Sequence, residues 1–314
     1  MRAFFSRSVE PRRYFLVAVT TAAALLAVIS AVGLWSVFFD ASFGFQVLYQ
    51  HQLRKIADVR DVDTVLLGDS SLGNAVDAGE FSRLTGTRAV SLALTGSYGH
   101  AGSYNLLKRL DGRPVKNVVV MCALDTMNRD VSYAGYLLTL ADTKDVLELP
   151  AVERVELVAA FYDQILSVRK FKTALRNLLG FGKQQFFIES DYIRQGKPVD
   201  PTRTAPMQKS RIIPDKLRFL VRIRDYCVAR DINLIYVHGP IYEGVGRAST
   251  DYTVEANRLI SGAGVKLVPD LTFIGREEVG DSTDHVAPPL KTKFTARYAE
   301  LLKPHLRAGP APVR

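Results

Sequence analysis

Cysteine is scarce in this chain, with two residues among 314. Cys122 and Cys227 both fall in segments whose apolar pattern predicts burial, so two free buried thiols are expected, with a disulfide as the open alternative. Zinc sites need Cys and His ligands at short, regular spacings, and no such spacing occurs in the sequence. We therefore expect no structural metal and no cofactor. The chain also lacks internal repeats and low-complexity tracts, which excludes solenoids and disordered arrays.

Charged side chains are absent from Tyr14 to Phe39, a run of 26 residues. At about 1.5 Å per residue, a helix of this length exceeds the roughly 30 Å hydrocarbon core of a bilayer. The apolar region of a cleavable signal peptide is shorter, about 7–15 residues. The run predicts an uncleaved membrane anchor, with the lipid bilayer as partner of residues 14–39; a signal peptide is the alternative.

The residues before this run predict its orientation. Four arginines, Arg2, Arg7, Arg12 and Arg13, precede it, against the single acid Glu10. Positive residues stay on the cytoplasmic side of a span. We expect a single-pass inner-membrane protein with its N-terminus in the cytoplasm and its main domain in the periplasm or outside the cell.

The rest of the chain alternates between short apolar runs and amphipathic helical patterns. Alternation of this kind predicts an α/β fold, in which a parallel sheet carries helices on both faces. Right-handed crossovers favour a flavodoxin-like three-layer fold with strand order 2-1-3-4-5. Strands are expected at Val62–Leu67, Arg88–Leu94, Asn117–Ala123, Asn233–His238 and Val265–Val268, and helices near Ala78–Leu84, Gly99–Leu110, Asp215–Arg230, Thr250–Ser261 and Lys291–Leu302.

A helical insertion between the third and fourth strands interrupts this alternation, with a helix expected over Glu153–Gly180. From Arg169 to Arg224 the chain has 14 Lys/Arg and 4 Asp/Glu, whereas the whole chain carries a net charge of +9. The excess suits either a solvated basic face or the binding of an anionic glycan or lipid headgroup. Nucleic acid is not expected to meet an exported domain. The basic binding candidates in this segment are Arg169, Lys170, Lys172 and Arg176.

These patterns divide the chain into six predicted units. They are 1–40 (cytoplasmic tip and anchor), 41–61 (a helical or irregular connector), 62–131 (first part of the α/β domain), 132–214 (insertion), 215–307 (second part of the α/β domain) and 308–314 (tail).

The most informative stretch follows the first strand, where Gly68-Asp69-Ser70-Ser71 ends an apolar run. Open α/β sheets bind their ligands at the carboxyl ends of the strands. Asp and Ser also commonly cap helices, so a turn with a cap is the alternative. The late motif Asp281-Ser-Thr-Asp284-His285 favours chemistry, because a histidine can activate a serine hydroxyl as nucleophile.

Taken together, these motifs resemble the SGNH/GDSL hydrolase superfamily. Gly68-Asp69-Ser70 matches its first motif, Gly96 the glycine after strand two, and Asn128 is the nearest candidate for the asparagine after strand three. The resemblance covers about 62–128 and 230–302. The fourth motif, Asp-x-x-His, departs from the pattern, because Ser282 stands three residues before the histidine.

The resemblance implies a role for each residue. Ser70 would be the nucleophile and His285 its base, oriented by Asp281 or Asp284; we favour Asp281, since residues four apart are neighbours on a helical turn. The N–H groups of Ser70 and Gly96 and the Asn128 amide would stabilise the oxyanion. The alternative interpretations are that Asn128 only caps a helix and that Gly96 is only a glycine required by a turn. Further substrate-binding candidates are Asp69, Ser71 and His238, although for His238 a structural role is favoured.

Single-span, exported domains of this type resemble accessory enzymes of cell-surface polysaccharide O-acetylation. That resemblance implies serine-dependent acyl transfer to a glycan, beside a multi-spanning membrane acyltransferase. The alternatives are an esterase that deacylates a glycan or lipid, and a non-catalytic binding module with the same fold. The loop Gly96–Gly102 has neither P-loop nor dinucleotide-binding spacing, so nucleotide binding is not expected.

Overall fold

The computed structural model describes residues 11–39, 44–129, 147, 149–166, 188–189, 192–193 and 197–308. Its centre is a five-stranded parallel sheet. The strands lie in the order β2 (Ala89–Ala93), β1 (Thr64–Gly68), β3 (Asn117–Cys122), β6 (Asn233–His238) and β8 (Lys266–Val268). This is the predicted order 2-1-3-4-5, and it is confirmed. Strands buried on both faces need apolar side chains at consecutive positions, which explains their continuous runs.

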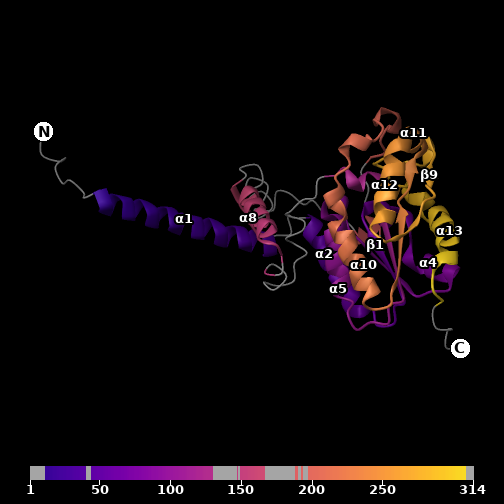
Figure 1. Cartoon of the computed structure of the whole chain (residues 1–314), viewed down its shortest axis with the longest axis horizontal. Coiled ribbons are helices and arrows are strands. Elements are labelled where there is room, and N and C mark those ends of the chain that lie inside the picture. Colours follow the sequence, from indigo (N-terminus) through magenta and orange to yellow (C-terminus); the bar gives the residue numbers. More distant parts are fainter. Residues whose placement is uncertain are drawn as a thin grey trace, which may run out of the picture.

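Two helical layers cover the sheet (Figure 1). One layer packs on the sheet face that contains Leu67, Val120 and Tyr236, and the other on the face that contains Leu66, Met121 and Val237. The first layer consists of α2 (Gly44–Asp58), α5 (Gly99–Lys108), α10 (Arg218–Val228) and α12 (Thr250–Gly262), and the second of α3 (Ser70–Ala75), α4 (Ala78–Thr85) and α13 (Lys291–Leu302).

Side-chain spacing explains why these helices pack. Phe294, Tyr298 and Leu302 recur every four residues on α13, so they fall on one side of it, and all three are fully buried. Asp77 caps α4 by accepting from the amide of Glu80 at 2.8 Å. Gly86 ends α4 with φ +76°, a left-handed conformation that suits glycine.

The predicted connector is a helix with a distinct task. Helix α2 runs along the edge strand β2, whose outward carbonyls have no neighbouring strand. Gln52 Nε2 donates to the Ala93 carbonyl at 2.7 Å and Lys55 Nζ to the Ser91 carbonyl at 2.8 Å. An uncovered strand edge pairs readily with other chains. These two side chains satisfy two of its acceptors and cover that part of the edge.

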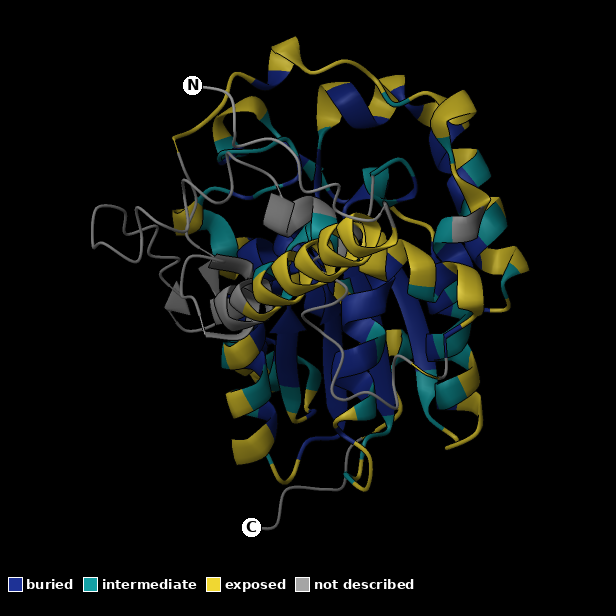
Figure 2. Cartoon of the chain, turned by 90° about the vertical axis from the view of Figure 1, so that its left-hand side faces the viewer, coloured by how far each residue is buried: buried dark blue, intermediate teal, exposed yellow. Residues whose placement is uncertain are grey.

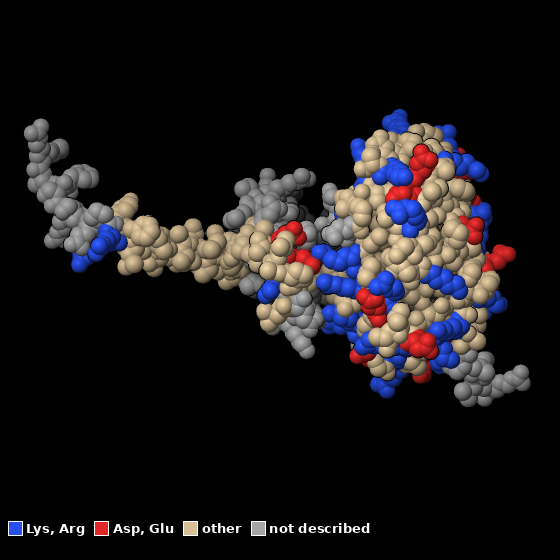
Figure 3. Space-filling model, in the orientation of Figure 1, with Lys and Arg blue, Asp and Glu red and all other residues tan. Residues whose placement is uncertain are grey.

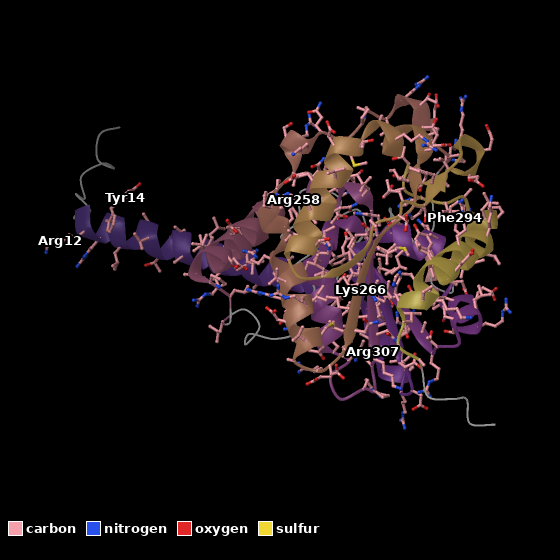
Figure 4. The ribbon with its side chains drawn as sticks, turned by 45° about the vertical axis from the view of Figure 1, so that its right-hand side comes forward. Arg12, Tyr14, Arg258, Lys266, Phe294 and Arg307 are labelled. Atoms are coloured by element: carbon pink, nitrogen blue, oxygen red, sulfur yellow. The ribbon has the colours of Figure 1, made fainter. Side chains whose placement is uncertain are left out.

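Helix α1 (Pro11–Phe39) projects from the α/β domain as a rod (Figure 1). Its segment Arg12–Ala31 is long and apolar enough to cross a membrane and is not buried by other parts of the structure. Figure 2 shows this helix exposed against the buried strands, and Figure 3 shows it free of charge beyond its first turn. Arg12 and Tyr14 extend from its far end, well away from the sheet (Figure 4). This agrees with the predicted apolar span.

The described parts of the predicted insertion reach the rest of the fold at several points. Helix α8 (Ala151–Leu166) contacts α1, and the hairpin β4–β5 (Ile188–Glu189 and Tyr192–Ile193) lies against α3. The amide of Val199 donates to the Gly280 carbonyl at 3.0 Å. Residues 167–180 of the helix predicted over Glu153–Gly180 lie outside the described residues, as do Arg169, Lys170, Lys172 and Arg176. The predicted extent of the insertion stays a prediction.

Several short elements complete the fold. The strands β7 (Ile241–Tyr242) and β9 (Phe273–Ile274) form a small parallel pair. The helix predicted over Asp215–Arg230 is observed as a 3₁₀ turn, Pro214–Leu217, followed directly by α10, and Pro214 suits the first position of that turn. The remaining short helices are η1 (Gly96–Tyr98), η2 (Leu124–Met127), η3 (Pro201–Arg203), η4 (Lys209–Arg211), α11 (Glu243–Ala248), η6 (Arg276–Glu278), η7 (Pro288–Leu290) and η8 (Lys303–His305).

Replacing Phe294 by alanine should lower the free energy of unfolding by about 3–5 kcal/mol, because it removes a buried ring and leaves a cavity. Val254→Ala is the control, since Val254 is 62% exposed on α12 and should change stability by less than about 0.5 kcal/mol. Urea unfolding of the full chain in detergent measures both. Equal losses would contradict the packing of α13 on the sheet.

Candidate active site

The turn between β1 and α3 is tightly constrained. A Cβ atom on Gly68 would lie 1.8 Å from the Met121 carbonyl oxygen, so only glycine permits β3 to approach this closely. Asp69 Oδ1 accepts from the amide and hydroxyl of Ser71 at 3.0 and 2.6 Å, and its Oδ2 accepts from the Ala123 amide at 2.9 Å. Asp69 therefore caps α3 and fastens it to the end of β3.

These contacts change the interpretation of two predicted substrate-binding candidates. Asp69 and Ser71 are 4% and 0% exposed, and the bonds described above occupy both side chains. In this structure they position the turn instead of lining a binding surface. Ser70, between them, is the first residue of α3 and is 8% exposed.

Ser70, His285 and Asp281 form a hydrogen-bonded row. His285 Nε2 lies 2.8 Å from Ser70 Oγ, and His285 Nδ1 lies 2.7 Å from Asp281 Oδ1. Both distances fall within the range expected for a nucleophile, its base and the carboxylate that orients the base. Of the two aspartates left open by the sequence, the structure brings Asp281 to the histidine ring.

The backbone around His285 explains how Asp281 reaches it. The Gly280 amide donates to the His285 carbonyl at 2.7 Å, and the His285 amide donates to the Ser282 carbonyl at 3.0 Å. Val279 and Val286 form an antiparallel bridge that closes the loop. Residues 280–285 thus make a tight turn that folds the Asp281 side chain back toward the imidazole.

Asp284 has a different partner, Arg129, which the sequence reasoning missed. Arg129 Nη2 donates to Asp284 Oδ2 at 3.0 Å, and Arg129 Nε lies 2.7 Å from Asp125 Oδ1. Burial opposes the charge on Arg129, but the carboxylates of Asp284 and Asp125 outweigh it and raise the pKa of the guanidinium. The available signal was an arginine directly after the candidate Asn128, but no spacing rule links it to an aspartate 155 residues away.

These charges affect the base. Burial alone lowers the pKa of His285, but the Asp281 hydrogen bond and the nearby carboxylates of Asp284 and Asp69 raise it overall, above its ordinary value of 6.5. Burial raises the pKa of Asp284, but the charges of His285 and Arg129 outweigh it and hold that pKa below its usual range. Asp284 is therefore ionised at neutral pH and adds negative potential beside the imidazole.

The predicted oxyanion donors lie at the same edge of the sheet. Ser70 and Gly96 each open a helix, where the first amides have no acceptor within the helix. A Cβ on Gly96 would lie 2.5 Å from Arg129 Nη1, so the guanidinium packs directly on this glycine. Asn128 follows η2, and its Oδ1 is buried with no hydrogen-bond partner within the described residues. The cation of Arg129 thus lies beside the predicted oxyanion site.

His238 does not share this rim; it has the structural role that the sequence analysis preferred to substrate binding. Its side chain is 1% exposed, and its Nε2 lies 2.6 Å from Asn257 Oδ1 on α12. Its ring also packs edge-on against Tyr236. Burial lowers the pKa of His238, although the Asn257 hydrogen bond opposes this. Because side chains alternate along a strand, the end of β6 directs this histidine to the sheet face opposite α3.

The arrangement supplies the groups that an acyl-enzyme reaction needs: a hydroxyl, a base, an acid that orients the base, and helix N-termini that can stabilise an oxyanion. Within the described parts of the chain, no group of three or more His, Cys, Asp or Glu side chains is placed to hold a metal ion. Cys122 and Cys227 are free and buried, as expected. No protein-family model, curated protein or solved structure matches this chain.

The structure predicts that the two aspartates fail in different ways. Asp281→Asn should lower acyl-ester turnover by roughly 10⁴-fold, because the histidine loses its orienting acceptor. Asp284→Asn should instead lower stability, by about 1–3 kcal/mol, because it removes the buried one of the two carboxylates that pair with Arg129 and leaves only Asp125. Turnover of a chromogenic acetyl ester and urea unfolding, measured on both variants, separate the two roles. The reverse pattern would make Asp284 the acid of the row.

The pH profile offers an independent check. Only the neutral imidazole can take a proton from Ser70, so kcat/KM for an acetyl ester should rise with pH through the pKa of His285, at a midpoint above 6.5. Asp284→Asn removes one of the carboxylates that raise this pKa, so its midpoint should move to lower pH. Lys293→Gln is a control, because Lys293 pairs with Glu278 on the surface and should leave the midpoint unchanged. A midpoint that does not move in Asp284→Asn would contradict the electrostatic account.

Proposed function

We propose that this protein is an SGNH-type serine acyltransferase or esterase that acts on acyl esters of a glycan outside the cytoplasm. The observation that carries the proposal is the Ser70–His285–Asp281 row, with hydrogen bonds of 2.8 and 2.7 Å. A protein that only binds a ligand has no need to keep a serine, its base and the orienting acid in line. The resemblance of the motifs to the SGNH/GDSL superfamily and the strand order support the same chemistry.

In the proposed reaction, Ser70 Oγ attacks the acyl carbonyl while His285 Nε2 takes its proton. The imidazolium is stabilised by Asp281. The oxyanion accepts from the Ser70 and Gly96 amides and lies near the Arg129 cation. His285 then gives its proton to the departing alcohol, which leaves an acyl group on Ser70. A sugar hydroxyl or water, deprotonated by His285, then attacks the acyl group. As the bond to Ser70 Oγ breaks, His285 returns this proton to the oxygen, which restores both the serine and the neutral histidine.

The proposed location follows from α1 and the basic residues before it. The span Arg12–Ala31 anchors the chain, with the N-terminus in the cytoplasm and the α/β domain on the other side. There the domain meets cell-surface glycans and, in the proposed O-acetylation role, acyl groups delivered by a multi-spanning membrane acyltransferase.

A fluorophosphonate probe should label the protein at Ser70, identified by mass spectrometry of the tryptic peptides. Ser70→Ala and His285→Ala should each abolish labelling, because the hydroxyl is a weak nucleophile without its base. Ser261→Ala is the matched control: Ser261 is an exposed serine near the end of α12, and its loss should leave labelling intact. A folded protein that takes no label would favour the binding-module alternative.

An acetyl ester offered with and without an oligosaccharide acceptor distinguishes transfer from hydrolysis. A transferase should pass the acetyl group to the sugar and release little free acetate, whereas an esterase releases acetate in both reactions.

The membrane topology is tested by reporter fusions after Lys55. An alkaline phosphatase fusion there should be active and a β-galactosidase fusion silent, and the opposite pattern would overturn the proposed location.

A further inference from the structure

Helix α8 is apolar on the side that no other part of the described chain buries. On its inner side, Leu157 is 2% exposed and packs with Phe219 of α10. Glu153, also on the inner side, is 4% exposed and pairs with Arg218 Nη1 at 2.8 Å. The outer side presents the valine stripe, which we define as Val152, Val155 and Val158, with exposures of 69%, 68% and 55%. Single exposed valines are ordinary, but three on one side of a helix form a patch that indicates a binding surface.

The charges on α8 flank this stripe. At about 100° per residue, Val152 and Val158 lie about 60° to either side of Val155. Glu156 and Arg154 lie about 100° from Val155, one on each side of the stripe. A helix with an apolar centre and charges at both margins suits the boundary between an apolar phase and water.

The neighbouring helix indicates what the apolar phase is. Tyr162 falls about 20° from the centre of the valine stripe, and its hydroxyl oxygen lies 2.9 Å from Ser30 Oγ on α1. Ser30 is one residue from the end of the candidate span Arg12–Ala31. Leu25 and Val28, in the preceding turns of α1, are both 61% exposed. The valine stripe therefore continues the apolar surface of α1 at the point where the span ends.

We propose that α8 lies in the membrane interface, with the valine stripe in the lipid of the leaflet in which the span ends. The proposal rests on the membrane location given under the proposed function. Figure 1 shows α8 between α1 and the α/β domain, where it would hold the domain near the bilayer. Lys and Arg side chains gather over α2 and α5 on the domain edge turned toward α1, where anionic headgroups would attract them (Figure 3).

This placement has a functional meaning. Glu153 and Leu157 fix α8 to α10, so the domain is joined to the membrane at two points, α1 and α8. Two attachments restrict rotation of the domain about α1, whereas one attachment leaves it free. The hairpin β4–β5, from the same predicted insertion, lies against α3, so the interfacial segment and the nucleophile helix are linked through this insertion. The substrate class indicated is an acyl group carried by a membrane lipid or a membrane protein.

The test is fluorescence quenching on the full chain reconstituted into liposomes. Single cysteines at Leu25, Val155 and Val254 carry an environment-sensitive nitrobenzoxadiazole label, and lipids with spin-labelled acyl chains act as quenchers. Cys122 and Cys227 are buried and do not compete for the label in the folded protein. Labels on Leu25→Cys and Val155→Cys should show blue-shifted emission and loss of intensity with the quencher lipid. Val254→Cys, a 62% exposed valine on α12, should show neither.

Quenching at 25 without quenching at 155 would overturn the interfacial helix and leave the anchor standing. A label at 155 that is shielded from water but not quenched by lipid would also overturn the proposal, because protein would then cover the stripe. An unquenched label at 25 would overturn the anchor itself, together with the interfacial helix. These readouts do not depend on catalysis, so they separate this inference from the proposed reaction.

A second measurement uses the double variant Val152→Asp, Val155→Asp. Charges in the stripe should cause a loss of turnover with a lipid-borne acyl ester and no loss with a water-soluble ester, because the latter reports only that the domain is folded. Val228→Asp is the matched control, since Val228 is 73% exposed on α10. Equal turnover of both esters in the double variant would contradict a role for α8 at the membrane.

Discussion

The site depends on one buried carboxylate, that of Asp69. It accepts from the first turn of α3 and from the Ala123 amide at the end of β3, so one side chain fixes the nucleophile turn to the neighbouring strand. Gly68 makes this possible, because any larger residue would strike the Met121 carbonyl. Losing the buried hydrogen bonds of a charged group costs more than those of a neutral one. This joint holds Ser70, the first residue of α3, beside the end of β3.

Charge pairing then decides which aspartate serves the histidine. Asp284 is adjacent to His285 in sequence, but Arg129 binds it at 3.0 Å and buries it. Asp281, four residues before His285 in a tight turn, accepts from the ring. The same arginine lies on Gly96, so a single cation links the acid loop to the predicted oxyanion site. The position of the acid loop and the charge beside the predicted oxyanion site thus both depend on Arg129.

Local patterns predicted most of the scaffold. The five strands begin and end within two residues of their predicted bounds, because buried parallel strands need continuous apolar runs. Ser70 and His285 were singled out by the motifs that resemble the SGNH/GDSL superfamily, and Asp281 by its four-residue spacing from the histidine. What local patterns could not identify was a non-local contact: Arg129 is recognised only by a partner 155 residues away. The choice between the two roles of His238 likewise needed Asn257, its partner on another element. Helix α3 was missed because six residues are too few to show a helical period.

The row of Ser70 and His285 joins positions 215 residues apart, and the histidine comes from a loop close to the C-terminal helix α13. During synthesis the serine therefore emerges long before its base. Until the second half of the sheet docks on the first, Ser70 has no histidine within hydrogen-bond reach. Under the proposed function, completion of the fold would therefore be the step that makes the hydroxyl reactive.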